Sequence, residues 1–177
     1  GSDSARAEDL HTLWSDDDIS AVLPMRGGAG ASRILPKLDF SLFEQKPKIL
    51  VGFSDITALL IAINQKSNLV TFHGPTLGLM FETAYTHSYY QKAIMGTSAI
   101  GLVTDPPNEV WGSEYPPTRM VIAEGKGRGL LTGGCLTLIR GLMGTPYEID
   151  CDDRIVFLED VDEEPHNIDR ILTQMIL

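Results

Sequence analysis

The sequence predicts an α/β fold: a parallel sheet with flanking helices, of the flavodoxin-like type, followed by part of a smaller, β-rich domain. Two observations lead to this prediction. Over residues 1–103, short apolar runs with β propensity alternate with amphipathic runs of helical period, which is typical of a parallel sheet with crossover helices. A stretch at 104–118 then holds four of the ten prolines, and closely spaced glycines follow it.

Each predicted element rests on a local pattern. Helices are expected where apolar residues recur at helical spacing, and strands where short apolar runs end in turn residues. The first part is predicted to hold helices at 5–14, 32–38, 55–65 and 83–95, a helix capped by Ser41, strands at 19–25, 48–52 and 69–72, and a glycine-rich turn at 26–30.

The second part is predicted in the same way. We expect β structure with close turns at 121–125 and 127–134, a helix at 136–143, a strand at 154–158 and a helix from 165 to the end. The chain is therefore divided into an α/β domain at 1–103, a proline-rich linker at 104–118 and the start of a β-rich domain at 119–177.

Composition excludes several classes of protein. The chain has 177 residues and a net charge of −10, so it lacks the basic surface that nucleic-acid binding needs. No stretch is long and apolar enough to span a bilayer, and no signal peptide is visible, which argues against a membrane partner. Cys135 and Cys151 have no metal-type spacing and are expected to be reduced thiols.

The most informative segment runs from Ile49 to Ala58, where a buried strand meets a helix. A serine at such a turn stands at the carboxyl end of the sheet, near the positive end of the helix, where a nucleophile is well placed. Ile56 replaces the second glycine of the usual G-x-S-x-G pattern. From the residues alone, Ser54 is therefore either a nucleophile or an ordinary helix cap.

Other polar residues follow predicted strands and should meet at the same edge of the sheet. His73 ends one strand, where it could shape the substrate pocket, or act as a base if its ring reached Ser54. Arg26 and Arg33 could each bind a substrate carboxylate or pair with surface acids. Glu159 ends the strand at 154–158, where it is either a catalytic carboxylate or a solvated one.

Six ordered blocks together resemble a known family. They lie at 26–35, 51–58, 71–75, 131–136 and 144–147, with the last formed by 157–161 and 168–172. The set is similar to the LD-carboxypeptidases (muramoyltetrapeptide carboxypeptidases) and to their relatives that confer immunity to microcin C. The resemblance covers nearly the whole chain.

The resemblance implies a serine peptidase with a Ser-Glu-His triad. Carried onto this sequence, it makes Ser54 the nucleophile and Glu159 the residue that orients the histidine. The oxyanion hole would consist of backbone N–H groups of Gly27 or Gly28 and of Asp55. Glycine suits this role because the backbone can approach the reacting atoms closely.

The family also implies a substrate and a setting. The expected reaction releases the terminal D-alanine from muropeptide tetrapeptides during peptidoglycan recycling, in the bacterial cytoplasm, by a homodimer that needs no metal or organic cofactor. Ala29 stands where the family often has an aromatic residue, and Cys135 where it commonly has asparagine. The family's histidine and first strand have no counterpart here, so we expect a central fragment that is inactive by itself.

Two other functions stay open at this point. One is the immunity activity, in which the same chemistry cleaves a peptidyl or aminoacyl nucleotide. The other is a non-catalytic module that binds muropeptides, which the missing histidine would favour.

Overall fold

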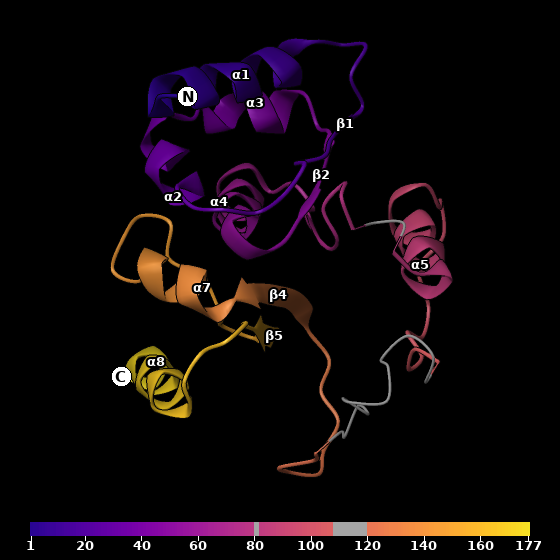
Figure 1. The fold of residues 1–177 in the computed structure, drawn as a ribbon, viewed down its shortest axis with the longest axis vertical. Helices are drawn as coiled ribbons and strands as arrows, with labels where there is room; N and C mark the ends of the chain where they lie inside the picture. Colours follow the sequence, from indigo (N-terminus) through magenta and orange to yellow (C-terminus); the bar gives the residue numbers. More distant parts are fainter. Residues whose placement is uncertain (80–81, 108–119) are drawn as a thin grey trace.

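The computed structural model describes residues 1–79, 82–107 and 120–177, which form two parallel sheets surrounded by helices (Figure 1). The α/β class with parallel strands and flanking helices is thereby confirmed. Of the expected linker, 104–107 is described and has no helix or strand, while 108–118 lies outside the described residues. The division into domains at these boundaries stays a prediction. Within the described ranges, no helix has both the length and the apolar content that a membrane crossing requires.

The first sheet has the order β1-β2-β3, with all neighbours parallel. Its strands are β1 (Ala21–Val22), β2 (Ile49–Gly52) and β3 (Phe72–His73). All three are shorter than predicted, β2 by one residue and the other two by more. Pro24 has no N–H to extend the ladder beyond β1. Just before β3, the side chain of Thr71 bonds to the helix at 57–67, where its Oγ1 donates to the carbonyl of Leu60 at 3.1 Å.

The helices of the first part have bounds that agree broadly with prediction. They are α1 (Asp3–Ser15), α2 (Ala31–Ile34), η1 (Leu35–Lys37), α3 (Phe40–Gln45), η2 (Ser54–Ile56), α4 (Thr57–Ser67) and α5 (Ala84–Ile94). The predicted cap of α3 is wrong. Asp39 is the N-cap, and its carboxylate accepts the N–H of Ser41 at 3.0 Å.

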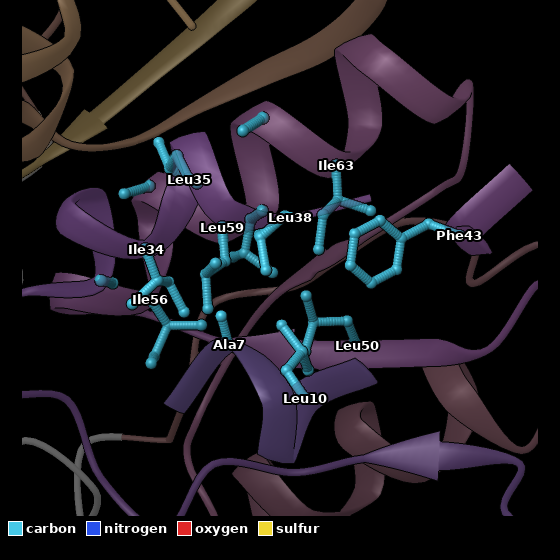
Figure 2. Packing of buried hydrophobic residues seen from close by; sticks show 14 of the residues in the cluster. Ala7, Leu10, Ile34, Leu35, Leu38, Phe43, Leu50, Ile56, Leu59 and Ile63 are labelled. Carbon is cyan, nitrogen blue, oxygen red and sulfur yellow. The ribbon is translucent and has the colours of Figure 1, made fainter. Parts of the chain in front are cut away.

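The main core lies between α1, α3, α4 and β2, where apolar side chains converge (Figure 2). Trp14 and Phe43 are fully buried, and their rings meet edge to face with centroids 4.7 Å apart. Every residue from Thr57 to Ile63 in α4 is buried, so this helix is enclosed on all sides. The helix predicted at 55–65 is confirmed, but its apolar residues surround the first two turns instead of forming one face, so the expected amphipathic pattern is wrong for α4.

The second part is a strand–helix–strand unit with a further helix. It consists of β4 (Leu130–Cys135), α7 (Leu136–Leu142), β5 (Arg154–Glu159) and α8 (Pro165–Ile176). β4 and β5 pair in parallel, in a register that places Cys135 opposite Glu159. The β structure predicted at 121–125 is wrong. Val121 and Ile122 are exposed, and no strand forms there, because this stretch has no neighbouring strand among the described residues.

Helix α4 joins the two parts, since it contacts both β2 and α7. Ile61 of α4 packs with Ile139 of α7 and with Ile149. At the far end of α4, the side-chain amide of Gln65 donates to the carbonyl of Glu148 at 2.7 Å and accepts the N–H of Asp150 at 2.9 Å. Helix α4 therefore contributes much of the contact that positions the second sheet.

We predict that Phe43→Ala lowers the free energy of unfolding by about 3–5 kcal/mol, because a fully buried ring in contact with Trp14 is lost. Urea denaturation followed by tryptophan fluorescence measures this. Leu13→Ala is the control, since Leu13 is 42% exposed and its removal should change stability by less than about 0.5 kcal/mol. Equal losses for the two variants would contradict the position of the core.

Candidate active site

Ser54 sits at the turn between β2 and the helical segment η2–α4. Its φ is +57°, a left-handed conformation that non-glycine residues rarely adopt and that is common in functional sites. Phe53 is the N-cap of η2, and no side chain caps either η2 or α4. The alternative that Ser54 is an ordinary helix cap is therefore wrong. The strained turn instead lifts the serine out of the strand, as a nucleophile elbow does.

The glycine-rich loop lies directly against this serine. A Cβ on Gly27 would lie 2.9 Å from Ser54 Cβ, 3.0 Å from Ser54 Oγ and 3.7 Å from the backbone nitrogen of Asp55. Only a residue without a side chain allows the two backbones to come so close. A Cβ on Gly28 would meet nothing within 4 Å, so this residue lies on the open side of the loop.

Asp55 ties the loop to the elbow. It is 7% exposed, and its Oδ2 accepts the N–H of Ala31, the first residue of α2, at 2.9 Å. This bond spans 24 residues and fastens the end of the glycine-rich loop to the residue after the serine. The structure thus brings Gly27, Ser54 and the N–H of Asp55 together, as an oxyanion-binding arrangement requires.

Glu159 ends β5, and its surroundings disfavour the charged carboxylate. Burial, and secondarily the charge of Asp160, raise the pKa of Glu159. Its Oε1 is buried and has no hydrogen-bond partner among the described residues. Asp160 itself is held in place, since its Oδ2 accepts the N–H of Thr137 in the first turn of α7 at 2.9 Å. The bond of Asp160 therefore holds the backbone next to Glu159 in place. One oxygen of the Glu159 carboxylate still lacks a hydrogen-bond donor among the described residues.

His73 lies beside Glu159, with 3.7 Å between His73 Nε2 and Glu159 Oε1. That distance is longer than a hydrogen bond. Burial lowers the pKa of His73 and so favours the neutral imidazole at neutral pH. In the described part of the chain, no hydrogen bond joins this imidazole to Ser54. The structure therefore does not favour His73 as a base that acts directly on the serine.

The two predicted arginines differ in their surroundings. Arg26 is exposed beside the glycine-rich loop, and the structure gives it no ion pair with a described residue. Arg33 instead forms an ion pair with Asp3 at 2.8 Å, on the surface near α1. Arg26 thus keeps its predicted substrate-binding role open, and Arg33 is engaged elsewhere.

Thr57 and Gly134, which the sequence did not identify as site residues, connect the serine turn to the second sheet. Thr57 is fully buried in α4, and its Oγ1 accepts the N–H of Cys135 at 3.2 Å. A Cβ on Gly134 would lie 2.6 Å from Thr57 Cγ2, so a side chain there would push β4 away from α4. Since Cys135 pairs with Glu159, this contact holds the end of β5 near the serine turn. A polar residue inside an apolar helix was the signal that could have identified Thr57.

No group of three or more His, Cys, Asp or Glu residues within the described ranges could hold a metal ion. Both cysteines are free, as expected. Burial raises the pKa of Cys135, which keeps its thiol neutral.

Comparison with protein families yields two matches, both from one family. The model described as the LD-carboxypeptidase N-terminal domain matches residues 1–74, and the model described as the LD-carboxypeptidase C-terminal domain matches residues 128–177. The two matches follow each other in chain order and together cover most of the sequence.

Among curated proteins, a probable murein peptide carboxypeptidase of Bacillus subtilis (strain 168) is 41% identical over 179 residues, covering 99% of this chain and 53% of that protein. The microcin C7 self-immunity protein MccF of Escherichia coli is 29% identical over 199 residues, covering 100% of this chain and 57% of that protein. The chain thus spans about half the length of the curated relatives it matches.

The solved structures similar to this chain include proteins of the same two kinds. An MccF-like protein from Bacillus anthracis str. Ames has a TM-score of 0.85 and 28% identity, over 99% of this chain and 58% of that chain. A muramoyltetrapeptide carboxypeptidase from Oxalobacter formigenes has a TM-score of 0.77 and 27% identity, over 99% and 56%. MccF in complex with aspartyl sulfamoyl adenosine has a TM-score of 0.79 and 25% identity, over 99% and 58%.

We predict that Asp55→Ala destabilises the protein by about 1–3 kcal/mol, because the buried N–H of Ala31 loses its acceptor. Asp55→Asn keeps an acceptor oxygen in the same place and should cost clearly less. Hydrogen exchange of the Ala31 amide is the direct measurement: protection should fall in Asp55→Ala and persist in Asp55→Asn. Unchanged protection in the alanine variant would show that the loop is held by other contacts.

Proposed function

Because this chain belongs to the LD-carboxypeptidase family, we propose that the full-length protein is a serine peptidase that releases the terminal D-alanine from muropeptide tetrapeptides. The observation that carries this proposal is the approach of Gly27 to Ser54, whose backbone has a left-handed φ. A serine held in this way, beside backbone N–H groups, is typical of acyl-transfer enzymes.

In the proposed reaction, Ser54 Oγ attacks the carbonyl carbon of the terminal peptide bond. The proton of Ser54 passes to a histidine, which we expect in the part of the full-length protein outside these 177 residues. The N–H groups of Gly27 or Gly28 and of Asp55 hold the oxyanion. The C–N bond then breaks, the imidazolium protonates the amine of the departing D-alanine, and water hydrolyses the acyl-enzyme.

Glu159 has the role of orienting that histidine and stabilising the imidazolium. Its carboxylate would accept an N–H from the incoming ring. The raised pKa of Glu159 fits the same picture, because a neighbouring imidazolium would favour the charged carboxylate that burial disfavours.

The substrate, the cellular setting and the assembly belong to the same proposal. A muropeptide carries a free carboxylate at its terminus, and the exposed guanidinium of Arg26 beside the glycine-rich loop is suited to bind it. Through the family resemblance, we further infer peptidoglycan recycling in the bacterial cytoplasm, a homodimer, and chemistry that needs no cofactor.

The immunity activity is the second candidate. It is favoured by the similarity to the MccF-like structure and by the nucleotide analogue bound to MccF. The same serine chemistry would act there on a peptidyl or aminoacyl nucleotide. Ala29 offers no ring for stacking on a base in the glycine-rich loop, and for this reason we place the muropeptide first.

We predict that full-length protein releases D-alanine from muramoyl tetrapeptide, as followed by mass spectrometry. Ser54→Ala should lower kcat at least about 1,000-fold, because the nucleophile is lost. Glu159→Gln should lower it roughly 1,000- to 10,000-fold, because the histidine loses its orienting charge. Ser20→Ala, at an exposed serine, is the matched control and should retain full activity.

Three outcomes separate the candidates. Cleavage of a peptidyl nucleotide but not of the muropeptide would transfer the same site to the immunity activity. Binding of muropeptide without cleavage by folded protein would indicate the non-catalytic module. Full activity of Ser54→Ala would contradict the serine mechanism itself.

A further inference from the structure

Glu159 has a neighbour that the triad does not use. His73 stands at the end of β3, on the strand next to the one that leads to the serine, with His73 paired to Gly52 in the ladder. Its imidazole reaches across to the second sheet, where Nε2 lies 3.7 Å from Glu159 Oε1. Among the described residues, no other basic side-chain nitrogen lies within 4.0 Å of the Glu159 carboxylate.

The imidazole packs against the second sheet. Its ring meets Phe157, two residues before Glu159 on β5, at a centroid distance of 5.0 Å and an interplanar angle of 68°. On the neighbouring strand, a Cβ on Gly134 would already lie 3.4 Å from His73 Nδ1, so a larger side chain there would crowd the ring. The position of the His73 ring is therefore set by contact with β5, the strand that carries Glu159.

The hydrogen-bonding state of the His73 ring also supports a contact with Glu159. His73 Nδ1 is buried and has no partner among the described residues. A buried N–H without a partner is rarer in proteins than a buried acceptor without one, so the proton belongs on Nε2. The Nε2–H then faces Glu159 Oε1, a buried oxygen that lacks a donor.

We propose that His73 is a positioning residue for Glu159: packed against Phe157 and close to Gly134, its imidazole directs Nε2–H at Glu159 Oε1 and fixes the rotamer of that carboxylate. The proposal rests on the proposed function, in which Glu159 orients the catalytic histidine. A movement of roughly 0.5 Å turns the contact into a hydrogen bond, and such contacts commonly tighten when substrate binds.

This arrangement gives the carboxylate two imidazoles with different roles. His73 approaches from β3 and stays neutral, since its burial lowers its pKa. The catalytic histidine becomes positively charged during the reaction and needs the negative charge of Glu159. A carboxylate held on one side by a neutral donor loses less rotational freedom when the second ring binds.

The kinetic test uses the full-length protein and two substitutions. His73→Phe keeps a ring against Phe157 but removes the donor, and kcat should fall about 10- to 100-fold while KM stays within about twofold. His73→Gln places an amide N–H near the position of Nε2 and should recover most of kcat. A raised KM with unchanged kcat would mean that His73 binds substrate, and would overturn the proposal.

A second measurement does not depend on turnover or on replacing His73. In the inactive Ser54→Ala protein, NMR titration of the His73 ring reports the charge next to it. Glu159→Gln should make His73 titrate at lower pH, because the neighbouring carboxylate that favours the protonated ring is gone. Asp162→Asn, at an exposed carboxylate on the same turn, is the control and should leave the titration unchanged.

The outcomes separate this inference from the proposed function. An unchanged His73 titration in Glu159→Gln would show that the two groups do not interact and would overturn the positioning role. Normal activity of His73→Phe together with an inactive Ser54→Ala would do the same, while leaving the serine mechanism intact. Full activity of Ser54→Ala would remove the proposed function itself.

Discussion

The contact between α4 and β4 is the constraint on which the candidate site depends. Thr57 is fully buried, and it accepts the backbone N–H of Cys135, while Gly134 leaves room for its methyl group. Thr57 lies three residues after the serine, and Cys135 pairs with Glu159 across the second sheet. One hydrogen bond and one missing side chain thus set the spacing between a serine and a carboxylate from distant parts of the chain.

The serine turn is a second constraint, and it is local. The left-handed backbone at Ser54 costs of order 1–3 kcal/mol and persists only where its surroundings hold it. The bond from Ala31 to the buried Asp55 carboxylate and the close packing of Gly27 supply that support. The strained turn and the glycine-rich loop therefore form one rigid unit, which is what a preorganised oxyanion site requires.

The parts that could be predicted from sequence are those governed by local patterns. The turn at Ser54, the strand that ends at Glu159 and most helices follow from residue type and spacing. The contact of Thr57 with Cys135 spans 78 residues, and the approach of His73 to Glu159 depends on how two sheets pack, so no local pattern contains either. The strand predicted at 121–125 failed for the same reason, because it finds no neighbour among the described residues. The cap predicted at Ser41 was a local error, since Asp39 two residues earlier takes that role.

The central claim is that Ser54 is an activated nucleophile in a site completed by Glu159. A fluorophosphonate probe, which forms a covalent bond with activated serines, tests it most directly on the full-length protein, followed by peptide mapping with mass spectrometry. We expect one adduct, on the peptide that contains Ser54, and much slower labelling in Glu159→Gln. An adduct on another serine, or no adduct on protein that cleaves its substrate, would contradict it.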